Sequence, residues 1–226
     1  MMPVLCRSIA VGFMALSSMC LISGCNIASA VGYTLSPEPE FEAKYQLADV
    51  PTVVFIDDRR GRVNPTRLRR VIADEATTQL IEEEAVSAAN MIAPRDAMLV
   101  ARKYDRSGEV ISISKVGELV GAEQVIYVDV EQFALTYDGV TPDPKAIARV
   151  RVLDLKTGKR VFPDPNDPGS YGYYQLVVEL PDHDPHGFNT VRVRNQMTEA
   201  LAMQTGDQLG KLFYRYIKSE LGGRLR

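Results

Sequence analysis

Two histidines and the aspartates beside them are the side chains of this chain whose types could hold a catalytic metal ion. They lie together in Pro181-Asp182-His183-Asp184-Pro185-His186-Gly187. Imidazole and carboxylate groups bind divalent metals, and a metal-bound water can hydrolyse a substrate. The segment has no zinc-type spacing and no third partner segment can be named, so a polar turn shaped by Pro and Gly also explains it. A metal-dependent hydrolase that uses His183 and His186 is kept as an alternative, and we expect no metal.

Other catalytic arrangements are limited by what the sequence lacks. It has no Gly-x-Ser-x-Gly elbow for a serine nucleophile, and a Ser-His-Asp triad would need the same two histidines. Asp57 and Asp58 follow an apolar run, where carboxylates could bind a cation or act as acid and base. A charged loop that pairs with its own arginines explains them equally well. We therefore predict no enzyme activity, no catalytic residue and no cofactor.

Arginines follow these aspartates more densely than anywhere else in the chain. Arg59, Arg60 and Arg62 are the candidate binding residues, and Arg67, Arg69 and Arg70 extend the cluster. The cluster could bind lipid phosphates, cell-wall acids or an acidic protein surface. The alternative is a solvated face with internal pairs such as Arg70 with Asp74. The whole chain has 26 Lys and Arg against 29 Asp and Glu, a formal net charge of -3, which argues against a nucleic-acid partner.

Cys25 ends the N-terminal apolar run in Leu21-Ile22-Ser23-Gly24-Cys25. Residues 8–22 are of signal-peptide length, and Arg7 is the only charge before Cys25. The site resembles the lipobox of bacterial lipoproteins, and this resemblance implies that residues 1–24 are a signal peptide and that Cys25 carries palmitate-type acyl chains. Several buried chains anchor a protein durably. Asn26, which is not Asp, implies the outer membrane rather than the inner one, with the domain facing the periplasm or another extracytoplasmic side.

Two alternatives to lipidation remain open. The apolar run could be a retained signal anchor, or an ordinary signal peptidase could cut after Ala28-Ser29-Ala30. If residues 1–24 are removed, Cys25 is the only remaining cysteine, so no intramolecular disulfide is expected. Residues 25–50 would then form the lipidated N-terminus and a linker, because they contain Ser36-Pro37-Glu38-Pro39-Glu40 and show little periodicity. Tyr45 and Leu47 indicate that part of this linker could instead pack on the domain.

The first half of the expected domain, residues 51–226, alternates strands and helices. Residues 52–56 predict a buried strand, and Asn64 and Pro65 predict the start of a helix that reaches residue 84. A short strand is expected at residues 89–92 and a helix at residues 94–104. Ser112 and Gly121 have the residue types that begin and end a further short helix.

The second half favours antiparallel strands and ends in a helix. Strands are expected at residues 124–135, 147–155, 160–162 and 173–180. Asn189 is the expected cap of a long last helix whose apolar face continues to Ile217. The predicted class is therefore α/β, with a mixed β-sheet that contains an antiparallel meander, helices packed on it and a long C-terminal helix. Residues 51–226 are expected to form a single domain.

Three segments of this domain resemble an α/β module that several bacterial envelope proteins share. They are the strand at residues 52–56 with its helix, the junction at residues 119–128, and the hairpin at residues 152–158. The module occurs in the amino-terminal domain of the Tol translocation protein, in lipoprotein activators of penicillin-binding proteins and in the curli secretion lipoprotein. The resemblance implies protein partners in the envelope and assigns no interface residue.

The predicted function is a membrane-anchored envelope lipoprotein that acts as a non-enzymatic protein-binding or scaffolding module. Its expected partners are the lipid bilayer, through acylated Cys25, and an envelope protein. An oligomeric secretion channel like the curli lipoprotein is the first alternative. A channel needs membrane-spanning β-hairpins, and residues 137–145 and 163–172 are too short and polar to form them.

Overall fold

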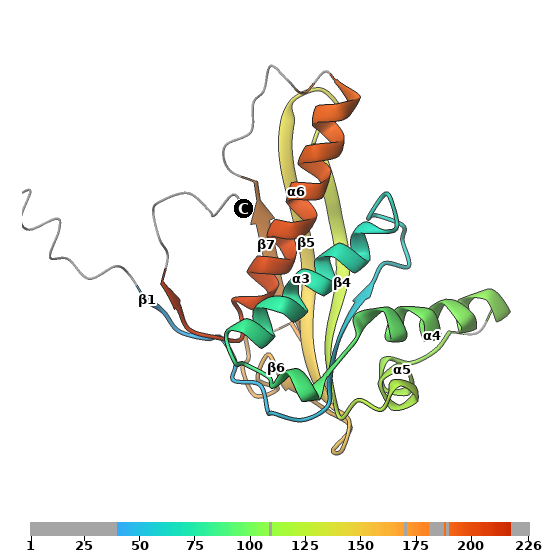
Figure 1. The fold of residues 1–226 in the computed structure, drawn as a ribbon, viewed down its shortest axis with the longest axis vertical. Coiled ribbons are helices and arrows are strands. Elements are labelled where there is room, and N and C mark those ends of the chain that lie inside the picture. Colours follow the sequence, from blue (N-terminus) through green and yellow to red (C-terminus); the bar gives the residue numbers. More distant parts are fainter. Residues whose placement is uncertain (1–39, 109, 170, 181–187, 189, 218–226) are drawn as a thin grey trace, which may run out of the picture. The chain divides into compact units, whose positions relative to one another are not determined.

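One mixed β-sheet organises the domain in the computed structural model, which describes residues 40–108, 110–169, 171–180, 188 and 190–217 (Figure 1). The strand order is β3-β2-β4-β5-β6, and β7 also pairs with β5. β2 is parallel to β3 and β4, whereas β5 is antiparallel to β4, β6 and β7. The strand bounds are β2 Thr52–Asp57, β3 Met91–Ile92, β4 Gln124–Thr136, β5 Pro142–Asp154, β6 Lys159–Phe162 and β7 Tyr174–Glu179.

Two layers of helices cover the two faces of this sheet. α3 (Leu68–Glu82) and α6 (Val191–Gly210) pack on one face, against alternate strand residues such as Ile56 and Val150. α4 (Pro94–Ser107) and α5 (Ile113–Val120) pack on the other, against residues such as Phe55 and Val125. All six residues of β2 are buried because this strand lies between both layers. The fold class predicted from the sequence is thereby confirmed, including the mixed sheet and the long last helix.

α3 and α6 lie side by side on their face of the sheet (Figure 1). A Cβ atom added to Gly206 of α6 would lie 2.5 Å from the carbonyl oxygen of Ile72 and 2.6 Å from Cβ of Glu75. Both distances are shorter than a van der Waals contact, so only glycine fits at this crossing. Gly206 therefore sets how closely the two helices approach.

The helix signals in the sequence were confirmed for α5 and were inexact for α3 and α6. The Ser112 side chain accepts a hydrogen bond from the Lys115 backbone N–H at 3.2 Å, and Gly121 ends the helix with φ of 77°. The helix expected from Pro65 begins instead at Leu68. Residues 65–67 form a turn, in which the Leu68 N–H donates to the Pro65 carbonyl at 2.9 Å, and Asn64 is not the cap.

The last helix and the strand before α4 also differ from expectation. Thr190, not Asn189, caps α6, and Asn189 lies outside the described residues. The helix ends at Gly210, and a turn then carries Leu212 and Phe213 into the core. Apolar spacing cannot separate a helix from an apolar turn that follows it, which explains the overprediction. A 3₁₀ turn, η1 Ala88–Asn90, occupies the start of the strand that was expected from residue 89.

The described end of the predicted linker packs on the domain. The backbone N–H of Lys44 donates to the Leu212 carbonyl at 2.8 Å, and the Tyr45 ring lies 5.7 Å from the ring of Phe162, between centroids. Leu47 packs on the same core. β1 (Glu40–Phe41) and β8 (Tyr216–Ile217) form a separate two-stranded sheet. Of the two alternatives for this segment, docking therefore holds from residue 41 to residue 50.

Several predicted features lie outside the described residues: the signal peptide at residues 1–24, Cys25, Asn26, and the loop with His183 and His186. Within the ranges that the structure describes, no helix is both long enough and apolar enough to cross a membrane. The same ranges hold no group of three or more His, Cys, Asp or Glu side chains placed to bind a metal ion.

Candidate functional site

The loop after β2 is held in place by two buried carboxylates. Oδ1 and Oδ2 of Asp58 accept hydrogen bonds from the backbone N–H groups of Arg62 and Val63, at 2.7 and 2.8 Å. The Oδ2 atom of Asp57 accepts one from the Tyr127 hydroxyl at 2.9 Å and lies 3.0 Å from Nε of Arg59. The pairing of this loop with its own arginine, expected as the alternative to a cation site, is therefore observed.

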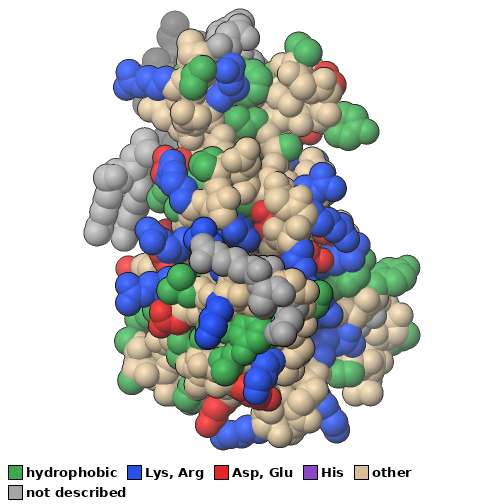
Figure 2. All heavy atoms as spheres, turned by 90° about the vertical axis from the view of Figure 1, so that its right-hand side faces the viewer, with side chains coloured by type: hydrophobic (Ala, Val, Ile, Leu, Met, Phe, Trp, Pro, Cys, Tyr) green, Lys and Arg blue, Asp and Glu red, His purple; other side chains and the backbone are tan. Residues whose placement is uncertain are grey.

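The three candidate arginines of this loop do not meet on one surface. Arg59 also donates to the Ile111 carbonyl at 3.2 Å, and with Arg60 it lines a recess beside Ile111. Arg62 lines a different recess, beside Tyr137 of the β4–β5 hairpin. Figure 2 shows that Lys and Arg side chains spread over the middle of one face of the molecule, with fewer Asp and Glu among them. A larger group of arginines lines a different cavity.

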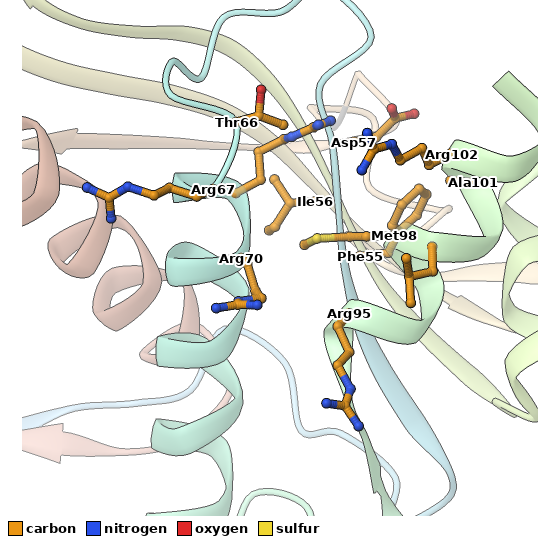
Figure 3. Close-up of a pocket in the computed structure, with 12 residues that line it drawn as sticks. Phe55, Ile56, Asp57, Thr66, Arg67, Arg70, Arg95, Met98, Ala101 and Arg102 are labelled. Atoms are coloured by element: carbon orange, nitrogen blue, oxygen red, sulfur yellow. The ribbon is translucent and has the colours of Figure 1, made fainter. Parts of the chain in front are cut away.

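A groove of about 630 Å³ lies between the first half of α3 and α4. Its floor is formed in part by Phe55 and Ile56, and Figure 3 shows Met98 reaching from α4 towards Ile56. β3 pairs only with Thr52 and Val53, so no described strand covers the remainder of this edge of β2. The groove therefore opens onto apolar side chains at an uncovered strand edge. Its walls carry five arginines: Arg67, Arg69 and Arg70 from α3, and Arg95 and Arg102 from α4.

Three of the five arginines are paired with acidic residues. Arg67 points away from the groove, towards α6 (Figure 3), where its Nη1 lies 2.8 Å from Oε1 of Glu199. The side chains of Arg70 and Asp74 approach to 3.5 Å, as the sequence suggested, and those of Arg95 and Asp96 approach to the same distance. Of the five arginines that line the groove, Arg69 and Arg102 are the two without such a pair among the described residues.

Arg69 and Arg102 form no ion pair with any residue that the structure describes. They face the same groove from opposite walls, and Figure 3 shows Arg102 extending from α4 towards the side of Asp57. Asp57 is the one carboxylate among the lining residues, and Arg59 already pairs with it. An anion in the groove would therefore meet two guanidinium groups that form no ion pair within the described part of the chain, beside a carboxylate that Arg59 and Tyr127 already engage.

The sequence indicated only one wall of this groove. Arg67, Arg69 and Arg70 belong to the arginine cluster that the sequence showed, whereas Arg95 and Arg102 were not singled out. Arg95, Leu99 and Arg102 are spaced by four and then three residues, so they share one face of α4. This spacing predicts that the three residues share a face of the helix, but no pattern in the neighbouring sequence predicts that this face lies opposite α3.

The hydrogen bond between Tyr127 and Asp57 gives a prediction for alkaline pH. Burial, and next the nearby charge of Asp57, raise the pKa of Tyr127 above its usual value of 10.0. The folded state therefore favours the neutral phenol, and the stability it contributes is complete below pH 10 and is lost as the pH rises above 10. In Tyr127→Phe, we expect the free energy of unfolding to fall less steeply above pH 10, by up to about 1.4 kcal/mol per pH unit.

Urea denaturation at a series of pH values measures this slope. Tyr171→Phe is the matched control, because the Tyr171 side chain is exposed and its hydroxyl is not held in the core. Equal slopes for wild type and Tyr127→Phe would show that the phenol does not resist ionisation in the folded state.

Comparisons with known proteins give low similarity. No protein-family model matches the chain, and no curated protein matches it. Among solved structures, the PelC dodecamer from Paraburkholderia phytofirmans is 13% identical, with a TM-score of 0.38 over 80% of this chain and 99% of that one. Lipoprotein GNA1162 from Neisseria meningitidis is 12% identical, with a TM-score of 0.34 over 67% and 99%. The LpoB C-terminal domain from Salmonella enterica is 12% identical, with a TM-score of 0.33 over 59% and 86%. These values do not assign the chain to a family.

Proposed function

We propose that this protein is an envelope lipoprotein whose acylated Cys25 holds a non-enzymatic binding domain at a membrane surface. The lipobox-like Leu21-Ile22-Ser23-Gly24-Cys25 supports the anchor. Asn26 favours the outer membrane as its location. The bilayer is one partner through the acyl chains, and the second partner is an envelope protein that the domain binds.

The groove between α3 and α4 is the observation that carries the binding role. It combines an apolar floor with two guanidinium groups that have no ion-pair partner among the described residues. Arginine, methionine and aromatic side chains are enriched at protein interfaces relative to the rest of the surface. The buried carboxylates nearby serve the fold instead, because Asp58 binds its own loop and Asp57 binds Arg59 and Tyr127.

The anchor is tested by metabolic labelling of cells with an alkyne analogue of palmitate. We expect wild-type protein to carry the label and to sediment with the membranes. Cys25→Ala should lose the label completely, because the thiol that accepts the diacylglycerol is gone and no new amino group forms at this residue for the third acyl chain. Cys20→Ala is the matched control, since Cys20 lies in the predicted signal peptide and should leave labelling unchanged. Label that persists in Cys25→Ala, or unlabelled wild-type protein, would contradict the lipoprotein assignment.

The role of tethering is tested by crosslinking intact envelopes and purifying the protein with its partners. We expect Cys25→Ala to recover much less of a partner than wild type does, because the anchor raises the local concentration of the domain at the membrane. If both proteins recover equal amounts, recognition by the domain does not depend on the tether. If neither recovers a partner above the level of an unrelated lipoprotein, the binding role is wrong.

A further inference from the structure

The charge of the groove selects an anionic partner. Arg69 and Arg102 face it from opposite walls and lack ion-pair partners within the described ranges. The three paired arginines sit against Glu199, Asp74 and Asp96, whose carboxylates lie on α6, α3 and α4 and do not line the groove. A guanidinium group binds a carboxylate through two parallel hydrogen bonds, which gives direction as well as strength. Two such groups, one on each wall, suit two carboxylates of one ligand.

The floor of the groove selects an apolar group between those carboxylates. Phe55, Ile56 and Met98 line it, and the side chain of Leu99 beside them is 61% exposed, so it is accessible to a ligand. Met98 is unbranched and adapts to the shape of what packs on it. An apolar side chain that enters the groove would therefore exchange water for contact with several apolar residues.

A protruding peptide side chain fits this site better than the headgroups of a bilayer do. Headgroups form a layer that covers an exposed basic surface, whereas the apolar floor here lies in a recess about 630 Å³ in volume. The chain as a whole has a net charge of -3, which opposes general attraction to an anionic membrane. A local positive groove in an acidic protein favours one acidic segment of a partner.

We propose that the groove between α3 and α4 binds a peptide segment of a protein partner in which acidic residues flank an apolar side chain. Arg69 and Arg102 bind the two carboxylates, and the apolar side chain packs on Met98 and Leu99. This inference rests on the binding role proposed above and does not depend on the lipid anchor.

The probe for this inference is a short synthetic peptide with one tryptophan between two glutamates. The chain contains no tryptophan, so the fluorescence of the peptide can be followed without background from the protein. The full chain is purified in a non-ionic detergent and titrated into the peptide. We expect saturable binding with a blue shift of the emission, because the indole leaves water for the apolar floor. A peptide with two glutamines in place of the glutamates should bind at least about tenfold more weakly.

Variants locate the binding site on the protein. Arg69→Gln and Arg102→Gln should each raise the dissociation constant about tenfold, since each removes a charged hydrogen-bonding partner. Arg102→Lys should fall between wild type and Arg102→Gln, because lysine keeps the charge and loses the two-bond geometry. Arg192→Gln, an exposed position on α6 outside the groove, is the control and should not change binding. Circular dichroism confirms that each variant is folded.

Three results would overturn the inference. The glutamine peptide could bind as well as the glutamate peptide, or Arg60→Gln could weaken binding while Arg69→Gln and Arg102→Gln do not. In the third, the glutamate peptide does not bind. If micelles with phosphatidylglycerol then bind the wild type more strongly than the arginine variants, the groove is a lipid site. If crosslinking still recovers a partner from envelopes, the proposed binding role holds even when the groove does not bind the peptide. The two proposals can therefore fail separately.

Discussion

Gly206→Val is expected to lower the free energy of unfolding by about 3 kcal/mol. The first atom of the new side chain would meet the backbone carbonyl of Ile72 at 2.5 Å and Cβ of Glu75 at 2.6 Å. A backbone atom cannot rotate aside as a flexible side chain does, so α6 must move away from α3. This movement separates the two helices that cover one face of the sheet and exposes part of their shared core.

Chemical denaturation followed by circular dichroism measures the loss in Gly206→Val. Met203→Val is the matched control, because Met203 is half exposed on the same helix and the substitution introduces the same β-branched side chain there. We expect the control to change stability by less than about 1 kcal/mol. If the two substitutions cost the same, the closeness of α3 and α6 does not depend on the missing side chain at Gly206.

Asp58→Ala is expected to cost about 3 kcal/mol, because it leaves the N–H groups of Arg62 and Val63 without their acceptors inside the protein. The Asp58 side chain is buried and holds the loop that follows β2. Asp58→Asn should cost less, since the amide oxygen still accepts one of the two hydrogen bonds. The measurement is the midpoint of urea denaturation with the slope unchanged.

Asp138→Ala is the control, because Asp138 also accepts hydrogen bonds from two backbone N–H groups but is exposed. Asp138 accepts from the backbone N–H groups of Val140 and Thr141, at 2.9 and 2.7 Å, at the tip of the β4–β5 hairpin. Water can replace the lost carboxylate there, so we expect a much smaller change than for Asp58→Ala. If Asp58→Ala and Asp138→Ala lower the free energy of unfolding equally, burial does not determine how much these hydrogen bonds stabilise the protein.

Local signals predicted the elements of this fold, and long-range packing determined what those signals could not. Ser112 and Gly121 mark the ends of α5 because capping involves only neighbouring residues. Asn64 and Pro65 carry the same kind of signal, yet α3 begins at Leu68, where the buried face of the helix starts. Tertiary packing of that face sets the first residue of the helix more strongly than its capping residue does.

The groove could be predicted only in part for a similar reason. Arg69 is conspicuous in the sequence because five other arginines lie close to it. Arg102 is not, because its importance comes from the opposite wall, about thirty residues further along the chain. What brings the two together is the layered sheet, in which α3 covers one face and α4 the other. The arginine cluster in the sequence therefore predicted the α3 wall of the groove, whereas the α4 wall follows only from the topology of the fold.

The short β3 leaves the two walls of the groove on separate hydrophobic cores. Because β3 covers only Thr52 and Val53, the rest of this edge of β2 is open between the two walls, and each wall packs on a different hydrophobic core. Met98 packs against both cores and is the side chain that joins them at the floor. A side chain that enters the groove and packs on Met98 would therefore rest on a residue that both hydrophobic cores hold.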